Sequence, residues 1–264
     1  MSTSFSRLWA YRGFIVSSVK REFQLRYQNS ILGASWTILN PLAMMLVYTL
    51  IFSQVMQARL PGADTPYAYS IFLISGLLPW GLLTDIVSRG PTLFLDQANL
   101  LKKIHFPKIA LLVIAVANSL INFGIIFGLF LLFLLLSGQF PGWIILWVLP
   151  ILLLQICFAA SLCLILAILN VFFRDVAPLT NIALQFGFWL TPILYAQSMV
   201  PAQYQQYLAL NPLSHIFESY HAIFLAHEAP NWGALLAPVI LCGILIVIAT
   251  RLFNKHAAEM VDEL

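Results

Sequence analysis

Very few side chains in the apolar part of this chain could do chemistry. Asp85 is the one acidic residue in the long apolar runs, and it lies four residues before Arg89, near the end of its run. Residues four apart share a helix face, so this spacing predicts an ion pair at a helix end. Pumps and secondary transporters place acids, bases or cation ligands near mid-membrane. The sequence therefore does not favour a proton- or ion-driven mechanism.

Motifs for metal binding, redox chemistry and nucleotide binding are also missing. No H-E-x-x-H or C-x-x-C pattern occurs, so we interpret the histidines as interface or solvated residues and the cysteines as small packing residues. The residues concerned are His105, His215, His221 and His227, and Cys157, Cys163 and Cys242. No G-x-x-x-x-G-K-[ST] loop is present either, so any ATP and magnesium must bind to another chain. We expect no catalytic residue, metal site or cofactor in this chain.

Composition identifies the solvent of the fold. Of the 264 residues, 61% are hydrophobic and 9% are charged, whereas soluble domains have about 25% charged residues. Lipid is the solvent that accommodates such an excess, and backbone groups in lipid must be paired internally, in helices or closed barrels. The apolar runs are too long for barrel strands of about 10 residues. We predict an all-α integral membrane protein.

Six apolar segments are long enough to cross a bilayer core of about 30 Å. They are residues 31–53, 67–88, 109–137, 143–171, 177–196 and 232–253, all within a single transmembrane domain, 1–264, that ends in a tail, 254–264. All 13 lysines and arginines except Arg59 fall before the first, between the second and third, between the fourth and fifth, or at the end of the sixth and after it. The positive-inside rule then places both termini in the cytoplasm. Pro178 and Pro192 lie in the fifth segment, so we expect it to line a cavity.

Two cytoplasmic pieces have amphipathic patterns. Residues 5–28 place Leu8, Tyr11, Ile15, Val19 and Phe23 on one helical face, with most basic residues off it. That pattern predicts a helix lying in the cytoplasmic interface. Residues 91–106, between prolines, predict a second, short amphipathic helix.

The external connection, 197–231, predicts two short amphipathic helices before the last span. One begins near Pro201. The other has Asn211 as its cap and Pro212 at its first position. Its apolar side chains follow at helical spacing and include Leu213, Ile216, Phe217 and Tyr220. We expect these helices to lie over the outer mouth of the bundle or to dip into the interface.

Aromatic residues gather in the first and fifth segments. They include Trp36, Tyr48, Phe186, Phe188 and Trp189. Trp and Tyr often form belts at the membrane surface, which is one interpretation; the other is an aromatic-lined passage, whose rings offer flat surfaces to sugar C–H groups. Phe186 and Trp189 share a helical face, whereas Phe188 is about 200° from Phe186 and points elsewhere.

Five collinear stretches carry a family resemblance. They are Leu25-Arg26-Tyr27 with Ser30, Leu32-Gly33, Trp36 and Pro41; Gly76-Leu77-Leu78-Pro79-Trp80; Asn99-Leu100 with Lys102-Lys103 and Phe106-Pro107; Asn170-Val171-Phe172-Phe173-Arg174-Asp175-Val176; and Asn211-Pro212-Leu213. Together they resemble the membrane subunits of type-2 ABC exporters of O-antigen, capsule or teichoic-acid chains. The resemblance covers nearly the whole chain.

The resemblance implies a homodimer in the cytoplasmic membrane, with a channel lined by spans one and five. Two copies of a nucleotide-binding ATPase subunit would dock below it, and the cargo would be a lipid-linked polysaccharide rather than a nucleic acid. The implied channel residues are Trp36, Tyr48, Phe186 and Trp189. The implied coupling residues are Asn99, Leu100, Leu101, Lys102 and Lys103, with Arg174 and Asp175, and the implied external gate is Leu213, Ile216, Phe217 and Tyr220.

Two alternatives remain at the sequence level. A permease of the same superfamily that exports drugs or small lipids would share the architecture but not the aromatic tract and the sugar-exporter motifs. A membrane-embedded enzyme would need paired carboxylates, or a nucleophile with a base, at membrane depth. Neither arrangement occurs in the apolar segments.

Overall fold

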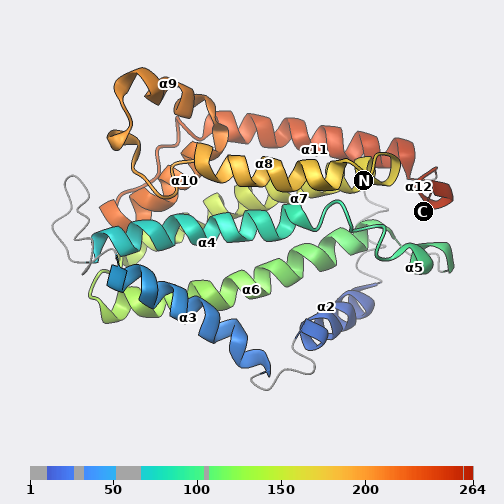
Figure 1. Ribbon diagram of the computed structural model, residues 1–264, viewed down its shortest axis with the longest axis horizontal. Coiled ribbons are helices and arrows are strands. Elements are labelled where there is room, and N and C mark those ends of the chain that lie inside the picture. The colour runs from blue at the N-terminus through green and yellow to red at the C-terminus, as the bar shows by residue number, and fades with distance from the viewer. Residues whose placement is uncertain (1–10, 27–32, 52–66, 104–106, 258, 264) are drawn as a thin grey trace.

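The described part of the chain is an all-helical bundle without β-strands. The computed structural model describes residues 11–26, 33–51, 67–103, 107–257 and 259–263. Among these residues, four stretches are long and apolar enough to cross a membrane: α4 (Ala68–Ser88), α6 (Ile109–Leu136), η3 (Gly142–Trp147) continued by α7 (Val148–Phe172), and α11 (Leu236–His256). Figure 1 shows them running side by side. These four helices fit the integral membrane protein predicted from composition.

The α4 helix is the centre of the bundle. Of its most apolar 18-residue stretch, 78% is buried, against 22% for α6 and 17% for α11. It packs against α6, α7 and α8 (Val176–Leu190), and against α10 (Pro212–His221) at the end predicted to be external. Because α4 is enclosed by protein, its side chains can make specific contacts, whereas most of the apolar surface of α6 and α11 is not covered by the described chain.

The fifth predicted span is shorter than expected. The α8 helix ends at Leu190, and Thr191 is extended (φ −107°, ψ 136°). A residue before proline avoids the helical region, so Pro192 sets this end. Pro178 lies in the first turn of α8, where proline is tolerated. The two prolines therefore bound α8 rather than interrupt it, and the cavity argument drawn from them is wrong.

The first predicted span is represented by α3 (Trp36–Tyr48), continued by a π-helical turn to residue 51. The remainder of that segment, 31–32 and 52–53, lies outside the described residues. At 13 and 15 residues, α3 and α8 are shorter than the four long helices. Six crossings therefore remain a prediction.

The predicted interfacial helix corresponds to α2 (Arg12–Arg26). It is shorter than the predicted 5–28, whose outer parts lie outside the described residues. The predicted face is confirmed, since Tyr11, Ile15, Val19 and Phe23 are half-buried whereas Arg12, Lys20 and Arg21 are exposed. The half-buried side chains pack toward α6.

The predicted coupling helix over 91–106 is only partly correct. Residues 91–97 form successive turns, and the helix itself, α5, covers Ala98–Lys103. Residues 104–106 lie outside the described part. The tail contains a short helix, α12 (Glu259–Glu263), which packs against α5 and against the end of α7. Met260 on α12 is fully buried, and Lys108 Nζ donates to the carbonyl of Ala257 just before α12.

The external connection has the two predicted helices. A short η4 (Gln197–Met199) precedes α9 (Ala202–Leu210), which begins after Pro201, and α10 continues into a π-helical turn, η5 (Ala222–Ala226). Asn211 caps α10 as predicted, since its Oδ1 accepts from the Leu213 N–H at 3.1 Å. Its Nδ2 donates to Thr191 Oγ1 at 3.1 Å, which ties α10 to the end of α8. Figure 1 shows α9 standing out from the bundle while α10 lies against it.

Candidate translocation face and coupling elements

One face of α8 is exposed and carries the predicted aromatic pair. Phe186 and Trp189 are 64% and 60% exposed, and Leu179 and Ile182 continue the same stripe. Phe188 points the other way, with its ring centroid 5.7 Å from that of Trp80 on α4. Phe188 is therefore on another face than Phe186, as predicted, although its ring also meets the ring of Trp189 at 5.4 Å between centroids. The outer surfaces of Phe186 and Trp189 stay exposed.

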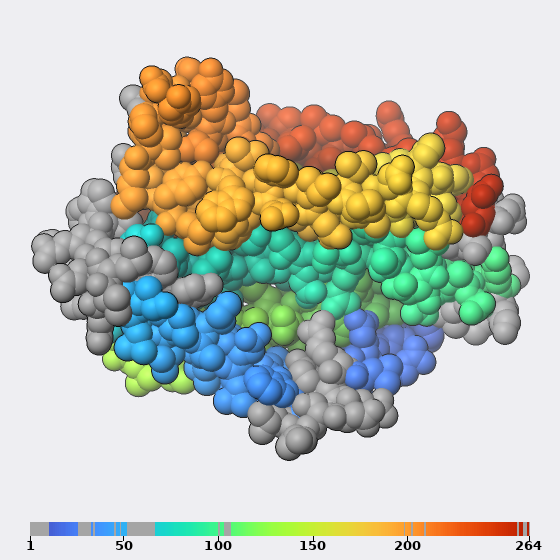
Figure 2. All heavy atoms as spheres, viewed as in Figure 1, coloured from blue at the N-terminus to red at the C-terminus, as the bar shows by residue number. Residues whose placement is uncertain are grey.

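The α3 helix contributes to the same face. Trp36 is 49% exposed at its start, and Leu39 and Leu42 are exposed beside it; the side chain of Tyr48 lies outside the described residues. Figure 2 shows α3 and α8 on one side of the molecule with α4 between them. The α3 and α8 helices are thus both uncovered on this side of the molecule.

A cavity of about 280 Å³ separates α3 from α4 and α6. Its lining is mostly apolar, with Asp85 and Ser119 among the polar exceptions. Ser119 Oγ and Asp85 Oδ2 are closed off from solvent and make no hydrogen bond among the described residues. The α3 helix is consequently packed less tightly on the bundle than α4 is.

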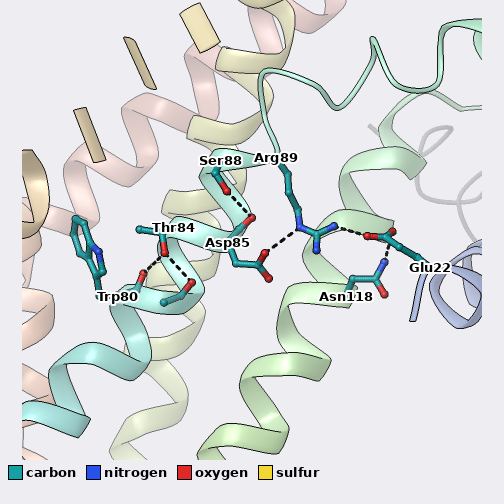
Figure 3. A network of polar contacts seen from close by, with 8 residues as sticks. Glu22, Trp80, Thr84, Asp85, Ser88, Arg89 and Asn118 are labelled. Carbon is teal, nitrogen blue, oxygen red and sulfur yellow. Dashed lines mark hydrogen bonds and ion pairs between the residues drawn. The ribbon is translucent and has the colours of Figure 1, made fainter. Parts of the chain in front are cut away.

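At the predicted cytoplasmic end, Arg89 joins the interfacial helix to two spans (Figure 3). Its guanidinium donates to Asp85 Oδ1 at 3.2 Å, and this contact confirms the predicted i, i+4 pair. It also donates to Glu22 Oε1 on α2 at 2.5 Å. Asn118 Nδ2 on α6 donates to the other Glu22 oxygen at 2.5 Å. Burial alone would lower the pKa of Arg89, but hydrogen bonding to Glu22 and the charge of Asp85 raise it. The network therefore holds α2 against the bundle with a permanent positive charge.

The predicted coupling residues lie at one end of the bundle. Asn99 and Lys102 on α5 are exposed, whereas Leu101 is 7% exposed and packs inward. The side chains of Leu100 and Lys103 lie outside the described part. Arg174 and Asp175, in the turn between α7 and α8, are exposed. Figure 1 places α5, α12 and the start of α8 at this same end, so one partner surface can reach them all.

The predicted gate residues are core residues in this chain. Ile216, Phe217 and Tyr220 are at most 1% exposed, and Leu213 is half-buried. Tyr220 Oη donates to Gln155 Oε1 on α7 at 2.8 Å, and Gln155 Nε2 donates to the Pro79 carbonyl on α4 at 2.6 Å. The apolar face of α10 therefore fixes this helix to the bundle rather than facing a passage within the chain.

One histidine differs from its prediction. His221 was expected to be solvated or interfacial, but its Nε2 is closed off and its ring stacks on Phe72 at 4.0 Å between centroids. His215 is half-buried, and its Nδ1 lies 3.6 Å from Glu218 Oε2. Burial raises the pKa of the Glu218 carboxyl, and the nearby His215 opposes that rise. In the part of the chain that the structure describes, no cluster of metal-ligating side chains occurs.

Comparison with known proteins decides what kind of membrane protein this is. The family profile described as "ABC-2 type transporter" matches residues 14–225, which include all the described helices from α3 to α10. The chain belongs to the ABC-2 type transporter family. It is therefore a multi-pass membrane subunit of a transporter, in agreement with the resemblance found in the sequence.

The relatives of this ABC-2 chain include exporters of polysaccharide. It is 34% identical to the O-antigen export system permease protein RfbA of Myxococcus xanthus over 97% of both chains. It is 29% identical to the protein of the same name from Klebsiella pneumoniae over 91% of each chain. A more distant relative, at 24% identity over 75% of this chain and 76% of the other, is the polysialic acid transport protein KpsM of Escherichia coli.

Several residues that organise this ABC-2 subunit escaped the sequence analysis. Glu22, Asn118 and Gln155 were not singled out, and Asn170 entered only as part of a motif. Each has a side chain that pairs far along the sequence. One signal was present, since a lone amide or acid in an apolar run must find a partner when it is buried. That rule marks the residue but not its partner.

Proposed function

We propose that this chain is the membrane subunit of an ABC exporter that moves a lipid-linked polysaccharide out across the cytoplasmic membrane. Two copies would enclose the passage, and two copies of a separate ATPase subunit would drive it. The observation that carries this proposal is the 34% identity with an O-antigen export permease across 97% of both chains. Identity of that extent covers the spans, the coupling segment and the external helices together.

The geometry supports the homodimer. The α3–α8 side of the chain exposes rings and aliphatic side chains that no part of the described chain covers. A second copy placed against the same side would enclose the rings between two chains. Ring faces stack on sugar C–H surfaces for about 0.5–1.5 kcal/mol per contact in the aromatic-pair analogy, weak enough to exchange as a polymer slides.

The proposed topology has six crossings and both termini in the cytoplasm. The four long helices cross as single spans, and the shorter α3 and α8 would complete the set. The partition of lysine and arginine supports this orientation. The α5 helix, the 173–175 turn and α12 would then face the ATPase.

ATP hydrolysis should depend on a partner chain. We expect the purified chain to hydrolyse no ATP, because its sequence lacks a phosphate loop. Co-expression with its ATPase should give ATP turnover in the purified complex, and deleting the gene should remove surface polysaccharide while the lipid-linked form accumulates inside. Surface polysaccharide that stays normal in the deletion strain would contradict the proposal, and altered retention of drugs or small lipids instead would favour the alternative cargo.

The exposed ring pair should matter for export. Replacing Trp189 or Phe186 by Ala should lower the export rate roughly two- to tenfold, since each lost ring contact weakens passage by about 0.5–1.5 kcal/mol. The rate is measured as labelled polysaccharide reaching the cell surface per unit of permease. Leu153→Ala on α7, whose side chain is 63% exposed on another helix, serves as the control and should export normally. If all three variants export polysaccharide at the same rate, the rings face lipid rather than the polymer.

A further inference from the structure

The side chain of Asn170 makes two hydrogen bonds to backbone groups of two different segments. It lies on the last turns of α7 and is 2% exposed. Its Nδ2 donates to the carbonyl of Pro91 at 2.8 Å, and its Oδ1 accepts from the N–H of Ala177 at 3.1 Å. One buried amide thus bridges the segment before α5 and the first turn of α8.

The chemistry of the two partners determines the orientation of this amide. The Pro91 carbonyl can only accept a hydrogen bond, and the Ala177 N–H can only donate one. A flipped amide would place acceptor against acceptor and donor against donor. The side chain therefore satisfies both partners in one orientation only.

The Ala177 end of the bridge caps α8. The first N–H groups of a helix have no partner within the helix, and a side-chain oxygen usually supplies one. Asp175, the N-cap residue of α8, makes no such side-chain bond. Asn170 supplies an acceptor from α7 instead, so the start of α8 is held by a residue outside its own turn.

The Pro91 end of the bridge belongs to the segment that leads into α5. Pro91 is buried, and it follows Gly90, whose Cα faces the backbone of α7 so closely that an added Cβ would lie 2.8 Å from the Cys163 carbonyl oxygen. The segment is therefore pressed onto α7 at this point. A displacement of residues 91–97 along α7 must break the Asn170 bond or carry the start of α8 with it.

We infer that Asn170 is a positioning residue that transmits motion of the coupling segment 91–103 to α8 and its exposed ring pair. The inference rests on the proposed function, because it assumes that an ATPase moves α5. The bridge is short, buried and directional, and it joins the two elements without a flexible linker. The contacts of α5 with α12 do not replace it, since in the described part they reach no N–H of α8.

Two substitutions separate the halves of the bridge. Asn170→Asp keeps an acceptor for the Ala177 N–H, at a helix start that favours a negative charge, but presents a second acceptor to the Pro91 carbonyl. Asn170→Leu has similar volume and removes both bonds. Ser161→Ala is the matched control, since Ser161 is a buried polar residue on the same helix whose hydroxyl bonds only the Cys157 carbonyl one turn back.

Two measurements give distinct expectations. Hydrogen exchange of the purified chain should show faster exchange at the start of α8 in Asn170→Leu, with Asn170→Asp and Ser161→Ala close to the wild type. In the complex with its ATPase, polysaccharide exported per ATP hydrolysed should fall about tenfold in both Asn170 variants, which corresponds to about 1.4 kcal/mol. Ser161→Ala should keep the wild-type ratio.

The outcomes are separable from those of the proposed function. Failure of the wild-type complex to export polysaccharide would reject the proposed function, whereas the exchange measurement needs neither ATPase nor cargo. Wild-type export per ATP in Asn170→Asp would overturn the inference, because the Pro91 half would then be dispensable. A tenfold fall in polysaccharide exported per ATP in Ser161→Ala would also overturn it. Removing any buried polar side chain from α7 would then have the same effect.

Discussion

Gly90→Ala is expected to prevent the stable folding of this subunit. An added Cβ would lie 2.8 Å from the Cys163 carbonyl oxygen and 3.0 Å from the Val87 carbonyl oxygen. Both atoms belong to helix backbone, so neither can move aside as a flexible side chain would. Overpacking at a site that cannot relax costs typically 1–3 kcal/mol and occasionally more, and we expect a loss of at least about 3 kcal/mol. The measurements are abundance in the membrane and the midpoint of thermal unfolding in detergent.

Gly128→Ala on α6 is the matched control. Gly124 and Gly128 form a G-x-x-x-G pattern, yet a Cβ at either position would meet nothing within 4 Å. Alanine is also the better helix former by about 1 kcal/mol. This variant should accumulate as well as the wild type. Equal stability of the Gly90 and Gly128 variants would show that the segment after α4 does not press on α7 as described.

Local patterns were sufficient to predict the helix starts and faces that depend on neighbouring residues. The Asn211-Pro212 pair predicted both the cap and the first residue of α10, because the cap bond reaches only two residues along the chain. The helical repeat predicted which residues share the apolar face of α2, although it placed that face in the membrane interface and the structure packs it toward α6. The Asp85–Arg89 pair was likewise a matter of i, i+4 geometry.

Helix lengths were predicted less well, because tertiary packing and proline decide them. Hydropathy carries no information about Thr191, whose extended backbone ends α8 before the apolar run ends. Residues 91–97 have an amphipathic composition but follow Gly90, where the chain is pressed onto α7 and turns instead of forming a helix. The apolar face of α10 looked like a surface for an outer mouth, but the bundle buries it.

Long-range polar pairing could not be predicted from one sequence. Glu22 and Arg89 are 67 residues apart, and Asn170 and Pro91 are 79 apart. Nothing in the local pattern of either partner identifies the other. These pairs nevertheless connect the coupling region to the rest of the subunit, since Arg89 reaches α2, which precedes α3, and Asn170 reaches α8. Residues 89–91 are thus connected to α2 and, through Asn170, to the start of α8, which carries the exposed ring pair.

Leu101→Asp should uncouple ATP hydrolysis from export. Leu101 is 7% exposed and belongs to the apolar core, as does the fully buried Met260 of α12. A buried, unpaired carboxylate costs several kcal/mol, more than a helix of six residues can offset by itself. We expect α5 to detach from α12 and from the core that buries Leu101. Export per ATP should fall at least about tenfold, the equivalent of about 1.4 kcal/mol, as measured in the reconstituted complex.

The fate of the protein distinguishes uncoupling from misfolding. The α5 helix lies outside the long spans, so Leu101→Asp should still reach the membrane in normal amounts, unlike Gly90→Ala. Leu101→Met conserves the buried volume and should cost less than about 1.5 kcal/mol, leaving export near normal. Lys102 is exposed on α5, so Lys102→Glu should weaken association with the ATPase without disturbing the packing of Leu101. Normal export by Leu101→Asp would remove α5 from the path of motion, because a helix that can lose its buried anchor without effect cannot be transmitting force through it.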